Sequence, residues 1–334
     1  MTILTTNNPT LADVAKRTAP DGSIDSQIVE LLNQTNEVLL DAAFIEGNLA
    51  TGHKSTVRTG LPQPTWRRLY GGVQPTKSTT VQVTDNCGML EDYAEVDKAL
   101  ADLNGNTAAF RLSENVAHIE AINQEVASTL IYGNEGSAPA EFTGVAARYN
   151  DLGADNADNI IDAGGTGSDN TSIWLMVWGP QTAHMIYPKA GKAMLQSNDK
   201  GQVTVENSDG QGGRMEAYRT HYKWDVGFTL RDWRYVARIA NIDVSDLATV
   251  ANTSNLINWM IAASERIPAF GMGRAAWYVN RTVREKLRLG ILNKISNNLT
   301  WETVAGQRVM MFDGLPVRRT DALLNTEARV VDQS

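Results

Sequence analysis

The residue types that carry most enzymatic chemistry are few in this chain, and their spacing forms no recognisable site. Its four histidines are scattered, at His53, His118, His184 and His221, and no two lie at the spacing of paired metal ligands. Cys87 is the only cysteine, which excludes an intrachain disulfide and a thiolate metal cluster. The motifs H-E-x-x-H, C-x-x-C and G-x-S-x-G do not occur. We therefore predict no catalytic, cofactor-binding or metal-binding residue and no cofactor.

Two glycine-rich stretches match nucleotide-binding loops only in part. In GNLATGHKS, residues 47–55, His53 separates the second glycine from Lys54, whereas a phosphate-binding loop needs the lysine directly after that glycine. In GMGRAA, residues 271–276, the third glycine and the acidic partner of a dinucleotide site are missing. Carboxylates are plentiful, but the sequence pairs none of them for acid–base catalysis. A soluble α/β enzyme without a linear motif stays open as an alternative.

The composition is that of an ordinary globular protein. Of 334 residues, 42% are apolar and 20% are charged, and the mean hydropathy is −0.28, which allows a sizeable core and one to three domains. No run approaches the ~18 consecutive apolar residues of a membrane span. The first residues, MTILTTNNPTLADVAKRTAP, lack a basic start followed by an apolar stretch. We expect a protein that folds in a cytosol and has no membrane partner.

The charge is acidic overall but unevenly distributed. A formal charge of −8 and a pI of about 5.1 argue against tight wrapping of nucleic acid. Residues 47–84 contain no acid, and their five cations are Lys54, Arg58, Arg67, Arg68 and Lys77. Residues 85–102 reverse this pattern, with six acids, among them Glu91, Asp92 and Glu95, against Lys98 alone. A basic segment beside an acidic one can attract the same pair on another copy of the chain; two solvated faces are the alternative.

The basic segment also reads as an extended flap. Its prolines and glycines, at Pro62, Pro64, Gly71, Gly72 and Pro75, exclude a long helix over residues 50–84. The flanking stretches KSTVRT and KSTTVQVT are β-branched and predict two hairpin arms. The bulky residues Trp66, Leu69 and Tyr70 lie between the arms, too few for a core. A platform on which single-stranded nucleic acid stacks is an alternative use of the two rings.

The clearest helix is predicted at residues 107–132. Its apolar residues recur every three or four positions and form one face, and Gly133 is a good terminator; they are Leu112, Val116, Ile119, Ile122, Val126 and Leu130. A second apolar stripe predicts a helix at 24–40, after a polar arm at 1–22. The acidic, glycine-rich residues 150–170 predict a loop.

Strands and shorter helices complete the chain. Alternation from Tyr222 to Ile239, with one change of phase, predicts a long strand at 222–240 interrupted by a bulge or sharp twist. Further strands are expected at 172–178, 183–187 and in AAWYVN, at 275–280. We predict a helix capped by Ser254 and another at 281–289 capped by Asn280. An element as long as residues 222–240 is more typical of an elongated shell subunit than of a compact enzyme.

Several segments, in order, resemble the major capsid proteins of short-tailed, epsilon15-like tailed bacteriophages. The resemblance rests on the stretches LPQPTWRRLYGGVQPTKSTTVQVTD, EDYAEVDKALADL, STLIYGN, PAEFTGVAARY, WDVGFTLRDWRYVARIANID, AAWYVNRTVREKL and DGLPVRRTDALLNTE. It covers nearly the whole chain. It implies an α+β, Hong Kong 97-like capsid fold with an N-arm, an E-loop, a P-domain with a spine helix and long β-strands, and an A-domain.

The resemblance implies a division of the chain into six parts. They are the N-terminal arm at 1–48, the E-loop at 49–86, a P-domain part with the spine helix at 87–140, an acidic connecting region at 141–170, the long P-domain strands at 171–247 and the A-domain at 248–334. The long strands precede the GLPV segment, whereas they follow it in the archetype of the fold, so we expect a rearranged connectivity. The long N-terminal scaffolding region is missing, so we expect the scaffold to be a separate protein.

The resemblance and the charge pattern together predict a structural protein and not an enzyme. The expected function is self-assembly of pentamers and hexamers into the icosahedral shell of a virion, assembled in the host cytoplasm around double-stranded DNA that is not bound sequence-specifically. Scaffold, portal and decoration proteins are the other expected partners. We expect intersubunit contacts between the flap and acids of a neighbouring copy, through Lys54, Arg58, Trp66, Arg67, Arg68 and Lys77 on one side and Glu91, Asp92 and Glu95 on the other.

Overall fold

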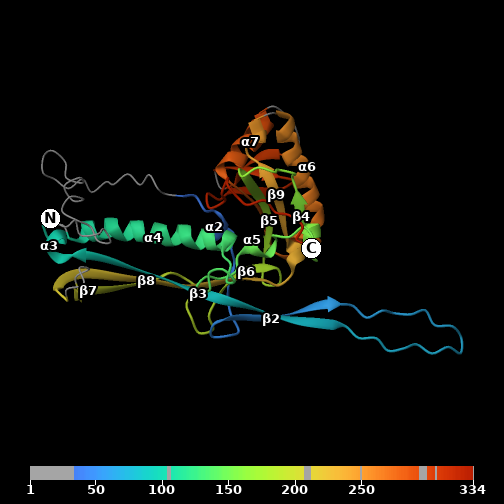
Figure 1. Ribbon diagram of the computed structural model, residues 1–334, viewed down its shortest axis with the longest axis horizontal. Coiled ribbons are helices and arrows are strands. Elements are labelled where there is room, and N and C mark those ends of the chain that lie inside the picture. Colours follow the sequence, from blue (N-terminus) through green and yellow to red (C-terminus); the bar gives the residue numbers. More distant parts are fainter. Residues whose placement is uncertain are drawn as a thin grey trace. The chain divides into compact units, whose positions relative to one another are not determined.

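The computed structural model describes residues 34–103, 107–206, 212–248, 250–292, 299–304 and 307–333 (Figure 1). The predicted arm and most of the predicted helix at 24–40 lie outside these residues. Residues 34–37 are not helical, and only the four-residue helix α2, Val38–Asp41, follows them. Asn36 instead forms a β-bridge with Thr320, and the Glu37 amide donates to the Arg319 carbonyl at 3.1 Å. Pairing with a distant segment therefore overrides the helical pattern there.

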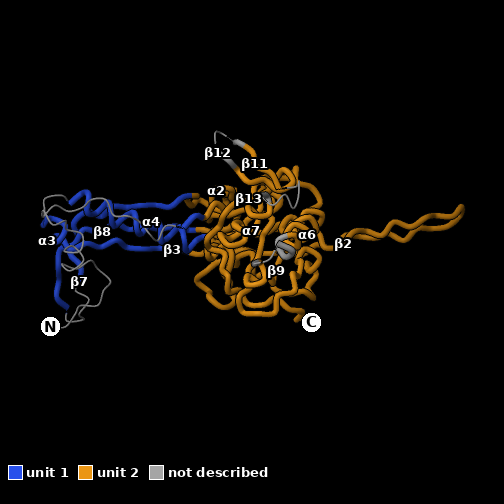
Figure 2. The backbone as a smooth tube through the Cα atoms, turned by 90° about the horizontal axis from the view of Figure 1, so that it is seen from above, with its two compact units in different colours: residues 1–35, 89–127, 194–225 blue, residues 36–88, 128–193, 226–334 orange. Residues whose placement is uncertain are grey.

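The chain forms two compact units (Figure 2). Unit 1 consists of residues 1–35, 89–127 and 194–225, and unit 2 of residues 36–88, 128–193 and 226–334. The segment 171–247, predicted as one set of long strands, is thus divided between them at residues 193 and 225. No described helix is both long and apolar enough to cross a lipid bilayer.

Unit 1 is built around a β-hairpin and a long helix. Strands β7, Gln196–Glu206, and β8, Arg214–Leu230, pair antiparallel from Gln196 opposite Lys223 to Glu206 opposite Arg214. The next strand in the sheet is β3, Thr79–Asp97, and the short helix α3, Lys98–Ala101, follows it. A small core of Val96, Ala101 and Phe110 joins β3 and α3 to the start of α4. Only residues up to Asp225 of β8 and from Met89 of β3 belong to this unit.

Helix α4 spans Thr107–Tyr132, as predicted. A side chain at Gly133 would place its Cβ 2.4 Å from the Phe142 carbonyl oxygen, so the helix ends where only glycine fits. The predicted apolar face is only partly covered. Its C-terminal members, Ile122, Val126 and Leu130, are buried, whereas Leu112, Val116 and Ile119 are 64%, 44% and 44% exposed. The spacing predicts the face correctly but not how much of it is packed.

The core of unit 2 is a mixed sheet in the order β4-β9-β5-β10-β13-β12-β11. The bounds of these strands are β4 Ile160–Asp162, β5 Asn170–Trp178, β9 Val236–Asp243, β10 Arg274–Val279, β11 Leu299–Val304, β12 Gln307–Phe312 and β13 Leu315–Arg319. All nine residues of the central strand β5 are buried. Helices α6, Val250–Arg266, and α7, Arg281–Leu292, pack against each other, and α6 also packs on β9 and β4. Their apolar faces join one core cluster with β5, β9 and β10.

A second group of strands in unit 2 carries the flap. Strand β1, Phe44–Glu46, pairs parallel with β6, Ala183–Tyr187, and β6 pairs antiparallel with the end of β8. Strand β2, Gly52–Gly60, pairs antiparallel with the first part of β3, so the predicted hairpin arms are confirmed. The remaining short elements of the unit are α5 Val145–Arg148 and the 3-10 turns η1 Ala157–Asn159, η2 Trp233–Tyr235, η3 Asp246–Ala248 and η4 Phe270–Met272.

The predicted single strand at 222–240 is wrong. Strand β8 ends at Leu230, the 3-10 turn η2 follows, and β9 begins at Val236 as a neighbour of β5. The change of phase in the alternation therefore marks a corner between two strands, closed by Asp232, which accepts a hydrogen bond from the Arg234 amide at 3.1 Å. Long strands do occur, because β8 has 17 residues and β3 has 19.

Three local predictions meet different outcomes. Asn280 caps α7, because its side-chain oxygen accepts from the Val283 amide at 2.8 Å. Ser254 is not a cap, since α6 begins four residues earlier, at Val250. The acidic residues 150–170 are not a loop throughout, because β4 within them pairs with β9.

Candidate functional site

The flap, residues 50–84, is exposed to solvent over most of its length. Its tip, residues 61–77, is exposed at every position, and Figure 2 shows the hairpin projecting from the rest of unit 2. Trp66 and Tyr70 have their full surface in contact with solvent, at 100% and 102%, and Leu69 is 88% exposed. Nothing within unit 2 covers these side chains. Large aromatic side chains left bare in this way are typical of a contact surface for another molecule.

The cations predicted as contact residues are all on the surface of the flap. Lys54 and Arg58 lie on β2, Arg67 and Arg68 at the tip, and Lys77 just before β3, all exposed. Within the described part of the chain, none of their side chains forms an ion pair. Arg67 Nε donates to the Arg68 carbonyl at 3.4 Å, and the backbone of Lys54 is hydrogen-bonded to the Asn48 side chain at 2.7 Å. Because residues 47–84 contain no acid, the flap presents unbalanced positive charge.

The base of the flap, by contrast, is anchored through the buried carboxylate of Asp85. Arg148 Nη2 lies 2.8 Å from Asp85 Oδ1, and the Thr229 hydroxyl donates to Asp85 Oδ2. The guanidinium of Arg148 also stacks over the Phe228 ring, 5.5 Å from its centroid. A buried charge held by a cation and a hydroxyl fixes the direction in which the hairpin leaves the unit.

Two buried histidines complete the base of the flap. His53 on β2 and His184 on β6 meet edge to face, with ring centroids 6.0 Å apart. Burial and the nearby charge of Arg231 lower the pKa of His184 to about 4, and burial lowers the pKa of His53. Both rings are therefore neutral at physiological pH. The His184 Nδ1 faces the Gly179 carbonyl at 3.2 Å, which is a structural role rather than that of a base.

The three acids predicted to receive the flap already contact basic side chains inside unit 1. Glu91 lies 3.1 Å from His221 Nε2 and 3.3 Å from Lys223 Nζ. The hydrogen bond from His221 lowers the pKa of Glu91. The partner of Asp92 is His118, on α4, and that of Glu95 is Arg219, on β8. The sequence could not reveal these partners, which lie between 26 residues (His118 from Asp92) and 132 residues (Lys223 from Glu91) away along the chain.

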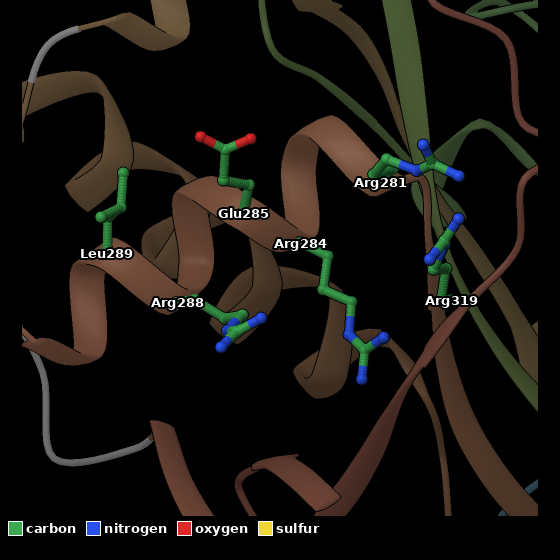
Figure 3. A pocket seen from close by; sticks show the side chains of 6 residues that line it. All are labelled: Arg281, Arg284, Glu285, Arg288, Leu289 and Arg319. Atoms are coloured by element: carbon green, nitrogen blue, oxygen red, sulfur yellow. The ribbon is translucent and has the colours of Figure 1, made fainter.

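The structure also assembles a cluster that the sequence analysis missed. Arginines on one side of α7, together with the last residue of β13, line an open cavity of about 340 Å³ (Figure 3), which we call the arginine pocket; its lining residues are Arg281, Arg284, Glu285, Arg288, Leu289 and Arg319. Arg284 and Arg288 project from the same side of the helix, and Glu285 projects from another side. The signal was present in RTVREKLR, where arginines recur after three and four residues.

The described surfaces do not bring together the side chains that bind a metal ion. Among the described residues, no group of three or more His, Cys, Asp or Glu side chains is placed to hold a metal ion. What the exposed flap and the arginine pocket offer is unpaired positive charge and bare aromatic surface, which suit binding of a protein partner or an anion rather than bond-making chemistry.

Comparison with known proteins gives a consistent result. Residues 19–331 match the sequence model of a family described as major capsid protein GP7. The structure is similar to that of bacteriophage epsilon15, with a TM-score of 0.79 and 39% sequence identity over 99% of both chains. It is also similar to the bacteriophage JBD30 capsid, with a TM-score of 0.50 and 11% identity over 94% of this chain and 99% of that one. No curated protein sequence matches significantly. The predicted α+β, Hong Kong 97-like fold is confirmed.

Proposed function

The chain belongs to the GP7 family of major capsid proteins, and we propose that its copies assemble through pentamers and hexamers into an icosahedral shell around double-stranded phage DNA. Formation of a capsid shell by self-assembly, and a place in the virion capsid, follow from the family and from the similarity to the epsilon15 structure. The ring sizes, the symmetry and the enclosed genome are the proposed part.

The observation that best supports this proposal is the fully exposed tip of the flap. Burying an aromatic side chain such as Trp66 removes roughly 150–250 Å² from water and stabilises a contact by roughly 2–3 kcal/mol. Because the tip has no partner within unit 2, this free energy is available only on contact with another molecule. In a shell of identical subunits, that molecule is the adjacent copy.

Electron microscopy combined with light scattering tests the proposal directly. We expect the expressed chain, alone or with its scaffold, to form closed particles whose images show five- and six-fold rings. A small oligomer of uniform size under every condition, including co-expression with the other assembly proteins of the phage, would contradict it and return attention to a soluble enzyme. Neither the family model nor the solved structures named above supports that alternative or a nucleic-acid-binding protein.

We further propose that the flap makes an intersubunit contact through Trp66 and the cations at 54, 58, 67, 68 and 77. Trp66 and its neighbours Leu69 and Tyr70 supply apolar area, while the cations steer the flap towards acidic surface. The acids Glu91, Asp92 and Glu95 remain the proposed receptors. The contacts that these acids already make with His118, Arg219 and His221 are partly exposed and therefore contribute little to stability. Replacing them with contacts to an incoming arginine changes the free energy little. The aromatic side chains thus contribute most of the binding free energy of this contact.

The remaining partners are proposed from the family resemblance and from charge. A separate scaffold protein, a portal and decoration proteins would act on the shell, and assembly would take place in the host cytoplasm. With a net charge of −8, the inner wall would lie beside packaged DNA without binding it tightly or sequence-specifically. When DNA is titrated into the unassembled chain, we expect weak binding whose affinity does not depend on salt concentration.

A further inference from the structure

The arginine pocket contains more positive charge than the chain itself neutralises. Arg319 forms a bidentate pair with Asp321, at 2.7 and 2.6 Å, and Arg281 lies 3.6 Å from the same carboxylate. Arg284 and Arg288 form no ion pair with any described residue; the guanidinium of Arg288 rests over the Trp301 ring, 5.6 Å from its centroid. Two guanidinium groups that project from one side of α7 (Figure 3) therefore have no ion-pair partner among the described residues.

Arg284 lacks a hydrogen-bond partner in the pocket. Its Nε is buried and has no hydrogen-bond partner among the described residues. Burial is the main cause that lowers the pKa of Arg284; the charges of Arg288, Arg319 and Arg318 add to it, and the charge of Glu37 acts in the opposite direction. A half-buried guanidinium that faces like charges and has an unsatisfied donor is stabilised when a carboxylate or another anion enters the pocket.

The same unit carries the opposite charge on another side. The acidic segment, residues 150–170, contains five aspartates and no lysine or arginine. Asp162 and Asp169 accept hydrogen bonds from within the unit, whereas Asp155 and Asp158 are exposed. The single ion pair of Asp158, with Arg266, is 3.9 Å long and exposed, so it holds this carboxylate only weakly.

The sheet separates these two surfaces. The acidic segment includes β4 and the pocket includes the last residue of β13, and the order β4-β9-β5-β10-β13 places three strands between them. At about 4.8 Å per strand, the two sites are roughly 20 Å apart across the sheet. Strand β12 pairs with β13 only at Leu315 and Pro316; beyond them the Glu37 amide donates to the Arg319 carbonyl, and the Arg319 side chain is 22% exposed. One copy cannot join its own two sites, but the pocket of one copy can meet the acidic segment of the next.

We propose that the arginine pocket of one copy receives Asp155 and Asp158 of the adjacent copy, as the head-to-tail contact that closes a ring of subunits. A contact between two different surfaces of the same chain repeats around a rotation axis, as rings of five and six require. Charge pairing at a partly solvated rim, rather than a rigid apolar interface, allows the two ring sizes to share one contact. This inference rests on the proposed shell-forming function.

A charge-swap experiment on the full chain tests this contact. We expect R284E/R288E and D155R/D158R each to reduce the yield of rings and particles by about tenfold or more, because like charges then face each other. Combining all four substitutions restores opposite charges and should recover most of the yield. The substitution K286E, on the same helix but outside the pocket, is a control for charge reversal on α7 with half the change in net charge, and should leave the yield within about twofold. Circular dichroism and urea unfolding of each unassembled variant check that it folds.

The outcomes separate this contact from the function on which it rests. If the wild-type chain forms no rings or particles under any condition, the proposed function fails. The proposed contact is wrong if the wild type assembles but the variant with all four substitutions does not regain its particle yield. It is also wrong if D155R/D158R assembles normally. If the pocket binds a small anion such as inorganic phosphate instead, R284E/R288E should assemble poorly while D155R/D158R assembles normally.

Discussion

Two tryptophans of unit 2 show how differently its regions use the same residue. Trp174, on β5, is completely buried, meets the Tyr149 ring edge to face at 5.9 Å, and has the Arg238 guanidinium 5.0 Å above its ring. Trp66, at the tip of the flap, has its whole surface in water. The central sheet is therefore stabilised within one chain, whereas the flap can gain stability only from a partner. The first region determines whether the subunit folds, and the second determines whether subunits assemble.

Truncating the two tryptophans is the strongest test of this division. We expect Trp174→Ala to reduce the free energy of unfolding by about 3–5 kcal/mol, because it leaves a cavity in the sheet core. Trp66→Ala should change it by less than about 0.5 kcal/mol. Urea unfolding of the unassembled chain measures both. Similar losses in the two variants would contradict the separation between a folding region and an assembly region.

A buried ion pair beside Trp174 gives the next largest effect. Arg238 Nη2 lies 2.8 Å from Glu327 Oε2, and its other donors reach the Ser172 hydroxyl at 3.0 Å and the Tyr149 carbonyl at 2.7 Å. Arg238→Met leaves the Glu327 carboxylate buried without a cation and should cost about 3 kcal/mol of unfolding free energy.

The pair can be neutralised to check that reasoning. In R238M/E327Q no charge remains buried at this site. The side-chain amide of the introduced glutamine can still accept a hydrogen bond from the Tyr132 hydroxyl, which lies 2.6 Å from Glu327 Oε1 in the wild type. We expect the double variant to regain a substantial part of the lost stability. The matched control is Arg67→Met, at the exposed tip, which should leave unfolding unchanged. A double variant less stable than R238M would show that the loss comes from packing and not from the unpaired charge.

The histidines at the base of the flap link the two regions through pH. The pKa of His184 is lowered to about 4 by burial and by Arg231, although Asp85 acts in the opposite direction. Its folded pKa is thus below the unfolded value of 6.5, so stability is fully present above about pH 6.5 and is lost as the pH falls towards 4. His53, also lowered, adds to this loss.

Urea unfolding between pH 6.5 and 5 isolates the histidine effect, because most carboxylates stay ionised over that range. We expect the wild type to lose about 1–2 kcal/mol from His184. The variant H53Q/H184Q should lose correspondingly less, since no imidazole remains there to be protonated. An equal pH dependence in both proteins would assign the effect to groups other than His53 and His184.

Local signals in the sequence predicted the elements, but not what covers them. The regular spacing and Gly133 were enough to place α4, because helix periodicity and its terminator are both local. That Leu112 and Ile119 remain exposed depends on which segments pack against the helix, and periodicity carries no such information. Likewise, the change of phase near residue 231 located a break, but alternation alone cannot distinguish a bulge within one strand from a corner between two strands.

The site was predicted less completely than the fold, for a related reason. The exposed cations of the flap were found because an acid-free stretch is visible in the sequence. The partners of Glu91 and Glu95 were not, because Arg219 and His221 become neighbours only when β8 pairs beside β3. The arginine pocket was missed because Arg319 is distant in sequence from α7, and only the fold completes the cluster.

The variant R67E/R68E should have the smallest effect on folding, and it tests most directly whether the positive charge of the flap is needed for assembly. Reversing Arg67 and Arg68 to glutamate changes only exposed side chains without ion pairs, so the free energy of unfolding should stay within about 0.5 kcal/mol of the wild type. Assembly into particles should be lost, because the flap would then carry acids towards the acidic surface of its neighbour. The variant K189E/K192E makes the same change in net charge at another exposed site of unit 2 and should still assemble. Normal particles from R67E/R68E would remove electrostatic steering from the flap contact and leave its aromatic side chains as the sole proposed source of binding.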